Sequence, residues 1–190
     1  MTTNYTSNKL ICIAGLAGAG KSTVSSIFKD CGFEYIRFGQ IVIDEVKKRG
    51  LIINEKNERK VREELRRKHG MAAMAKLNKG KIKKLLKTKN VVADGLYSFD
   101  EYKILKREFP NQLLVIAVYA PPNLRYKRIK KRLERGLTQE EAISRDYAEI
   151  EKLDKGGPIA MADWTIVNTG TKKDLFNQTH EAIKKLNIKK

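Results

Sequence analysis

Five short runs rich in apolar residues, separated by stretches with helical periodicity, set the pattern of this chain. The runs cover residues 10–14, 33–38, 91–95, 113–119 and 164–167, and each has the length of a strand in a buried sheet. Between them, apolar positions recur three and four residues apart, which indicates amphipathic helices. Strands that alternate with helices predict an α/β fold, with a mostly parallel sheet covered on both faces.

The periodic segments place the helices. The first follows residue 22 and stops near Gly32, and others are expected over 41–49, 58–68 and 99–109. A stripe at Met71, Met74 and Leu77 predicts packing, and residues 82–86 close a separate short helix. A long basic helix should run from Pro122 to near Gly136, another should start at Thr138, and residues 156–158 should form a loop before the last strand and a closing helix.

One stretch joins the first strand to the first helix and carries the clearest chemistry. It fits G-x-x-x-x-G-K-[ST], the phosphate-binding P-loop. Its small residues let the backbone turn tightly and aim N–H groups inward, and the following helix adds the positive end of its dipole. We expect ATP phosphates to bind there, with Lys21 on the β- and γ-phosphates and the Ser22 hydroxyl on Mg²⁺. The expected nucleotide contacts are Gly15, Ala17, Gly18, Ala19, Gly20, Lys21, Ser22 and Thr23.

Composition limits the other possibilities. The 190 residues suit a single domain, 1–190, and are 41% hydrophobic and 33% charged. No apolar run approaches the roughly 20 residues that span a bilayer, and the first nine residues lack a signal-peptide core. Cys12 and Cys31 have no Cys or His partner at metal spacing, which favours free thiols in a reducing cytoplasm.

The net charge of +18 raises the question of a nucleic-acid partner. Many lysines lie on otherwise amphipathic helices, which is typical of a solvated surface, and a basic cleft also suits a nucleotide substrate. A nucleic-acid-associated NTPase would need a wide basic face with exposed aromatic residues. The 7 Tyr and 6 Phe residues lie mostly in apolar patterns, so a small-molecule partner is favoured, with no membrane contact.

Charged residues outside the P-loop extend this interpretation. Asp94 ends an apolar strand, where a carboxylate can hold Mg²⁺ through water or accept the proton of an attacking hydroxyl; a turn residue is the alternative. The arginines of the basic helix recur on one face, at Arg125, Arg128, Arg132 and Arg135, and Arg145 lies on the next helix. Guanidinium groups match the charge that develops in phosphoryl transfer. We expect Arg132 and Arg145 to act on the phosphoryl group and Arg128 to contact the nucleotide, with a solvated face as the alternative for any one of them.

With these motifs, Arg145-Asp146 and the segment 162–170, the chain from about Lys9 to Leu186 resembles P-loop kinases of the nucleoside-monophosphate-kinase class. Within that class it is most similar to dephospho-CoA kinases and their AAA-type relatives. The resemblance implies a three-layer P-loop NTPase fold with a five-stranded parallel sheet of order 2-3-1-4-5. It also implies an acceptor-binding helical region over about 40–86, a helical lid over about 122–153, and Asn168, Thr169 and Gly170 beside the adenine.

The acceptor motif departs from this family. Dephospho-CoA kinases usually carry Asp-x-Asp after the second strand, and nucleotide kinases often carry Gly-Asp followed by an Arg. This chain has Phe38-Gly39-Gln40, and its next helix begins Ile41-Val42-Ile43. We expect Arg37 to compensate, with acceptor contacts from Arg37, Phe38, Gly39, Gln40, Gly95 and Tyr97.

The sequence therefore predicts an ATP- and Mg²⁺-dependent kinase acting on a small nucleotide-like acceptor. A dephospho-CoA kinase-like activity is the first hypothesis, a nucleoside monophosphate kinase the second, and a nucleic-acid-associated NTPase the alternative from another class. The lid should close over ATP, with Gly136 and Gly156-Gly157 as hinges, and should stay open without ligand because its arginines repel one another.

Overall fold

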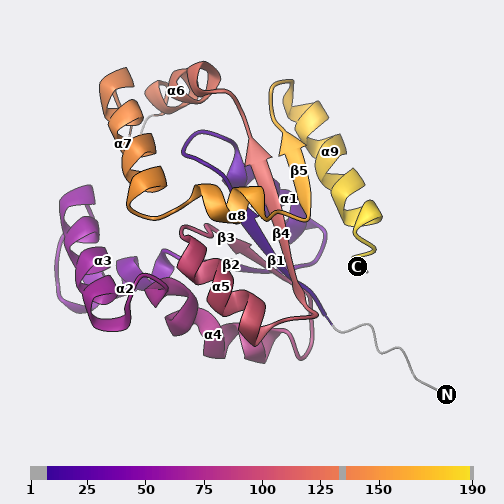
Figure 1. The fold of residues 1–190 in the computed structure, drawn as a ribbon, viewed down its shortest axis with the longest axis horizontal. Coiled ribbons are helices and arrows are strands. Elements are labelled where there is room, and N and C mark those ends of the chain that lie inside the picture. The colour runs from indigo at the N-terminus through magenta and orange to yellow at the C-terminus, as the bar shows by residue number, and fades with distance from the viewer. Residues whose placement is uncertain (1–7, 133–135, 189–190) are drawn as a thin grey trace.

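The five predicted strands form one parallel sheet, whose carboxyl ends meet at a single edge (Figure 1). The computed structural model describes residues 8–132 and 136–188. The strand order is β2-β3-β1-β4-β5, which confirms the predicted fold class. Their bounds are β1 Leu10–Ala14, β2 Glu34–Arg37, β3 Val91–Asp94, β4 Leu113–Tyr119 and β5 Trp164–Val167.

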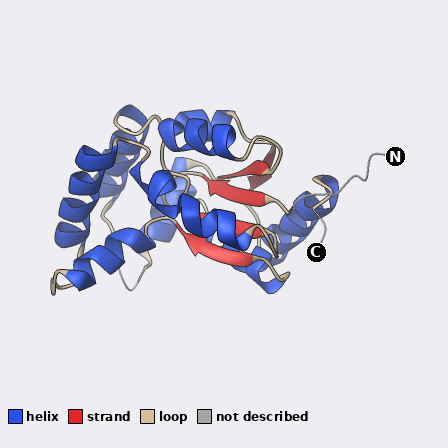
Figure 2. Ribbon diagram, turned by 90° about the horizontal axis from the view of Figure 1, so that it is seen from below, coloured by secondary structure: helices blue, strands red, loops and turns tan. Residues whose placement is uncertain are grey.

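The central strand β1 shows why the sheet is covered on both faces. Successive side chains of a strand point to opposite faces, and all five of its residues are buried. Leu10, Cys12 and Ala14 belong to one apolar cluster, and Ile11 and Ile13 belong to another. Figure 2 shows helices on both sides of the sheet. The first cluster is completed by α4 (Ala73–Leu85) and α5 (Phe99–Glu108), and the second by α1 (Lys21–Asp30) and α9 (Lys172–Lys185).

The remaining helices lie toward the carboxyl edge of the sheet. Two of them, α2 (Gln40–Lys48) and α3 (Glu55–His69), follow β2 and pack on each other. The others are α6 (Pro122–Lys130), α7 (Gln139–Glu151) and the short α8 (Gly156–Ala160), which returns the chain to the sheet before β5. The predicted starts at Ser98 and Thr138 are confirmed, because each side chain accepts a hydrogen bond from the backbone N–H three residues later.

Three predicted boundaries were wrong. The expected break between 71–77 and 82–86 is absent, because Gly80 lies inside α4 with open space around it and helices tolerate such a glycine at modest cost. Residues 156–158 open α8 instead of forming a loop, since a proline in the first turn interrupts no intrahelical hydrogen bond. The basic helix α6 ends at Lys130 and does not reach Gly136.

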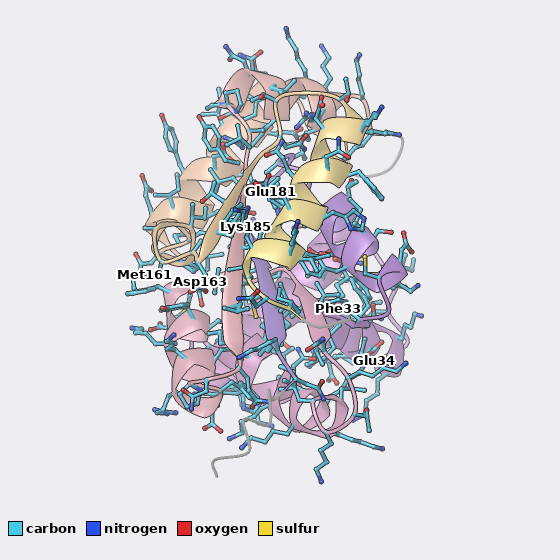
Figure 3. The ribbon with its side chains drawn as sticks, turned by 90° about the vertical axis from the view of Figure 1, so that its right-hand side faces the viewer. Phe33, Glu34, Met161, Asp163, Glu181 and Lys185 are labelled. Carbon is cyan, nitrogen blue, oxygen red and sulfur yellow. The ribbon has the colours of Figure 1, made fainter. Side chains whose placement is uncertain are left out.

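Asp163, which belongs to the family-like segment 162–170, lies between α8 and β5 and is labelled in Figure 3. The Asp163 carboxylate accepts a hydrogen bond from the Val115 N–H at 2.7 Å, which fixes the entry of β5 beside β4. Asp163 thus has a structural role. Of the helices in the described residues, none is long and apolar enough to cross a membrane.

Candidate active site

The P-loop lies at the carboxyl end of β1 and leads directly into α1, as predicted. Two of its glycines have positive φ angles and neighbours that leave no room for a side chain. A Cβ on Gly15 would lie 2.4 Å from the Val118 carbonyl oxygen, and one on Gly20 would lie 2.3 Å from the Asn168 amide nitrogen. The loop can therefore approach β4 and the segment after β5 closely only with glycine at these positions.

Three carbonyl groups of the loop are each held by a side chain. The Lys21 ammonium donates to the Leu16 oxygen at 3.0 Å, Arg125 Nη1 donates to the Ala17 oxygen at 3.1 Å, and Asn168 Nδ2 donates to the Ala19 oxygen at 2.8 Å. These bonds fix the orientation of the peptide groups. The first N–H groups of α1 have no intrahelical acceptors, so this end of the helix can receive phosphate oxygens.

Arg125 differs from its prediction. It is 3% exposed and forms a bidentate ion pair with Asp146, with Nη1–Oδ1 and Nη2–Oδ2 distances of 3.0 and 2.6 Å. Its Nε donates to the Ala120 carbonyl, and the Tyr126 hydroxyl also donates to Asp146. This guanidinium is fully used in joining α6, α7 and the P-loop. The expected repulsion between lid arginines is therefore wrong at this position, because Asp146 neutralises the charge.

Asp94 lies where the sequence placed it, at the end of β3 and in register with Ile13 of β1. Its carboxylate is half-buried and accepts a hydrogen bond from the Tyr35 hydroxyl at 3.3 Å. Ser22 is exposed in the first turn of α1. A hydroxyl and a carboxylate supply the oxygen donors that Mg²⁺ prefers, and this ion takes its other ligands from water and phosphate.

Sequence reasoning missed a buried ion pair beside the P-loop. Lys155, which is 1% exposed, lies 2.5 Å from Glu149 of α7, and the other oxygen of Glu149 accepts from Arg145 Nε at 3.1 Å. The Lys155 ammonium also lies 5.0 Å from the centre of the Tyr97 ring. Only the four-residue spacing of Arg145 and Glu149 is visible in the sequence. Nothing there places Lys155 against them.

These charges act on the P-loop lysine. Burial lowers the pKa of Lys21 to about 7, and the Lys155 ammonium lowers it further, while Glu149 and Asp94 act in the opposite direction. Burial alone would raise the pKa of Glu149, but the Lys155 ammonium holds it at about 2. Glu149 is therefore ionised at neutral pH, and a large fraction of Lys21 is uncharged before an anion arrives.

The other predicted nucleotide-binding residues differ in their exposure and in their hydrogen bonds. Arg128 is half-buried, and its Nη2 lies 3.4 Å from the Asn168 side-chain oxygen. Arg132 is exposed, and its side chain has no hydrogen bond or ion pair with a described residue. Asn168 is 7% exposed and holds the P-loop, while Thr169 and Gly170 are exposed beside it. Arg135 lies outside the described residues, so its predicted role is untested.

On the acceptor side, one predicted contact is wrong. The Phe38 side chain is fully buried in the core, so only its backbone can face a ligand. The Gln40 amide donates to Asp44, which places a carboxylate one helical turn beyond the motif where none was expected. Gly95 has a positive φ, and the Tyr97 ring packs against it. Arg37 is half-buried next to Asp94 in the sheet.

The fold is P-loop kinase-like and is shared with several solved structures. Three solved structures cover 94–95% of this chain: TT1252 from Thermus thermophilus (20% identity, TM-score 0.66), shikimate kinase from Bacteroides thetaiotaomicron (14%, 0.62) and a gluconokinase from Sinorhizobium meliloti (14%, 0.56). This chain covers 98%, 98% and 95% of them, respectively. At these identities the likeness shows the fold.

The family follows from sequence similarity. A family model described as an AAA domain matches residues 14–145, from the end of β1 into α7, and this chain belongs to that family. It also belongs with the UPF0200 proteins. The one from Thermococcus gammatolerans is 36% identical over 181 residues, which are 93% of this chain and 95% of the relative.

Proposed function

We propose that this protein is an ATP- and Mg²⁺-dependent phosphotransferase that acts on a small molecule. The observation that carries the proposal is the position of the P-loop at the carboxyl end of β1, with Asp94 at the end of the neighbouring strand β3, on the edge of the sheet where ligands of such folds bind. The solved neighbours named shikimate kinase and gluconokinase support a small acceptor. A dephospho-CoA kinase-like activity is the first candidate because of the sequence resemblance, and a nucleoside monophosphate kinase is the second.

The reaction assigns a task to each group. Lys21 and the N–H groups of the P-loop bind the phosphates, and Ser22 and Asp94 would hold Mg²⁺, which neutralises phosphate charge when bound. The oxygen of an acceptor hydroxyl attacks the γ-phosphorus, the bond to the bridging oxygen breaks, and ADP leaves. The alternative role of Asp94 is to accept the hydroxyl proton. Arg145, fixed by Glu149, adds positive charge on the side of α7.

Lys21→Ala tests the proposal. The variant should lose transfer of labelled phosphate from ATP and bind Mg²⁺-ATP much more weakly, because the cation among the phosphates is gone. Lys29→Ala, in an exposed position of the same helix, is the matched control. Acceptors to be screened are dephospho-CoA, nucleosides, nucleoside monophosphates, shikimate and gluconate. Wild-type turnover in Lys21→Ala, with an unchanged melting temperature, would remove the P-loop from the mechanism.

Residues 122–153 are proposed to move as a lid over the nucleotide within one domain of 1–190, and 40–86 to hold the acceptor. The predicted hinge at Gly156-Gly157 was wrong, since both glycines lie in α8 and a Cβ on Gly157 would lie 2.6 Å from the Phe99 ring. Because Arg125 and Asp146 join α6 to α7, these helices should move together.

Hydrogen exchange tests the lid. A non-hydrolysable ATP analogue should increase protection in α6 and α7 as well as in residues 15–22. Protection that rises at the P-loop alone would show that 122–153 does not close, and the exposed Arg132 would then be a surface residue.

A further inference from the structure

Tyr97, in the loop after β3, lies among cationic side chains from four different parts of the chain. Lys155 lies over its ring, and the charges of Arg37, Arg66 and Arg145 act on it. Arg37 ends β2, Arg66 belongs to α3, Arg145 belongs to α7, and Lys155 precedes α8. Positive charge therefore converges here from both the proposed acceptor region and the proposed lid.

These cations are not equally paired. Glu149 binds Lys155 and Arg145 together. Arg37 and Arg66 are half-buried, and their side chains form no hydrogen bond or ion pair with any residue in 8–132 or 136–188. Arg66 Nε is fully buried without an acceptor. A guanidinium removed from water without a partner is costly, and it stays protonated because its ordinary pKa is very high.

The neighbouring carboxyl group does not relieve this cost. Glu101 is fully buried, its Oε2 accepts the Tyr97 N–H at 2.8 Å, and its Oε1 has no partner. Burial raises the pKa of Glu101 to about 7 and lowers the pKa of Arg66, although each charge partly offsets the other. At neutral pH this carboxyl is therefore only partly ionised. An anion from outside the chain is the missing partner.

We propose that Arg37 and Arg66 bind an acidic group of the phosphoryl acceptor, a phosphate or a carboxylate, beside Tyr97. The inference rests on the proposed function and adds the class of acceptor: an alcohol or phosphate that carries a second, non-reacting anionic group. A neutral acceptor would leave both guanidinium groups without an ion-pair partner.

The first test measures anion binding directly. The protein is saturated with Mg²⁺ and a non-hydrolysable ATP analogue, so that the P-loop is filled, and inorganic phosphate or acetate is then titrated by calorimetry. Wild type should bind at least one of these probes, and Arg66→Met and Arg37→Met should each bind it about tenfold more weakly or worse. Arg67→Met is the matched control, because Arg67 is the exposed neighbour on α3. The better probe shows whether phosphate or carboxylate is preferred.

The second test uses matched alcohol acceptors with labelled ATP: gluconate against glucose, and shikimate against its methyl ester. Transfer should occur only to acidic members, and the arginine variants should raise the KM of the acceptor while the KM of ATP stays near its wild-type value. Equal use of a neutral partner, or absence of any anion binding to the wild-type analogue complex, would overturn the inference. So would equal affinities in all variants. Failure of the proposed function is seen separately, as unchanged binding of the ATP analogue to Lys21→Ala.

Discussion

The two sides of the P-loop use their positive charges differently. On the side of α6, Arg125 makes four hydrogen bonds, two to Asp146 and two to backbone carbonyls, and is 3% exposed. On the side of Tyr97, Arg37 and Arg66 are half-buried and have no partner among the described residues. Arg125 thus holds the loop together, whereas the guanidinium groups of Arg37 and Arg66 are available to a ligand.

This difference shows that the function of an arginine depends on whether its side chain already has a carboxylate partner, which the spacing of arginines in the sequence does not show. A buried guanidinium with a bidentate carboxylate is already satisfied, and it cannot turn toward a phosphate without leaving Asp146 alone in the core. A half-buried guanidinium without a partner is stabilised by an anion that binds to it. The predictions below separate these two kinds of arginine, beginning with the largest expected effect.

Arg125→Met should cause the largest loss of stability. It leaves the Asp146 carboxylate buried and unpaired and frees the Ala17 carbonyl, so the free energy of unfolding should fall by about 3–5 kcal/mol. Denaturant unfolding followed by circular dichroism measures the change. Lys127→Met, at an exposed position of α6, is the control and should unfold like wild type.

The double variant Arg125→Met/Asp146→Asn should recover part of that loss, since it removes the unpaired charge. If Arg125→Met unfolds at the wild-type denaturant concentration, the ion pair does not hold the loop, and the contrast between the two sides disappears. Arg66→Met should show little or no such loss, because it removes a cation that has no partner.

The sheet could be predicted because its signal is local. Each strand is a short apolar run next to turn residues. The predicted runs 113–119 and 164–167 have the same bounds as β4 and β5. The P-loop could be found from the fixed spacing of its residues, and Asp94 from its position at the end of an apolar strand. The order of the strands required the family resemblance, since pairing joins residues as distant as Ile13 and Asp94.

The rest of the site depends on contacts between distant segments. Arg125 meets its carboxylate 21 residues later, and Asn168 meets the Ala19 carbonyl 149 residues away. Lys155 and Arg66 gave no signal because a single lysine or arginine in a basic chain resembles many others. Phe38 was assigned to the acceptor by its place in a motif, but the alternation of the strand directs its side chain into the core.

Asp94→Asn should have a smaller effect on the fold and a large one on turnover. Asp94 lies between the two sides of the site, half-buried, with one side-chain hydrogen bond from Tyr35. We expect kcat to fall by about two orders of magnitude or more, with less change in ATP affinity, because a metal ligand or proton acceptor matters most in the transition state. Single-turnover assays at saturating Mg²⁺ measure it.

Asp100→Asn, in the first turn of α5 where Asp100 pairs with Lys103, is the control for this substitution. An unchanged kcat in Asp94→Asn would mean that Asp94 only shapes the turn before Gly95. Phosphoryl transfer would then depend on the positive charges of Lys21 and Arg145, without a proton acceptor or metal ligand at Asp94.

The smallest expected effect is the uptake of a proton by Lys21 when the nucleotide binds. It depends on Lys155, which lies beside Tyr97. The pKa of Lys21 is lowered to about 7 by burial and by the Lys155 ammonium, so at pH 8 most of this side chain is neutral. Nucleotide phosphates raise that pKa again, since an adjacent anion favours the ammonium form. Binding at pH 8 should therefore take up about one proton per site. Affinity should be highest below about pH 7 and fall as the pH rises above it.

Calorimetry of a non-hydrolysable ATP analogue in buffers of different ionisation enthalpy measures this uptake. At pH 8 a phosphate with a second pKa near ~6 is already ionised and contributes little. In Lys21→Arg the uptake should vanish, because a guanidinium is charged at every pH used. Lys155→Met should reduce it, because loss of that ammonium and the freed charge of Glu149 both raise the pKa of Lys21 in the empty protein. Equal uptake in wild type and Lys21→Arg would assign the proton to another group, and the cations beside Tyr97 would then act independently of the P-loop.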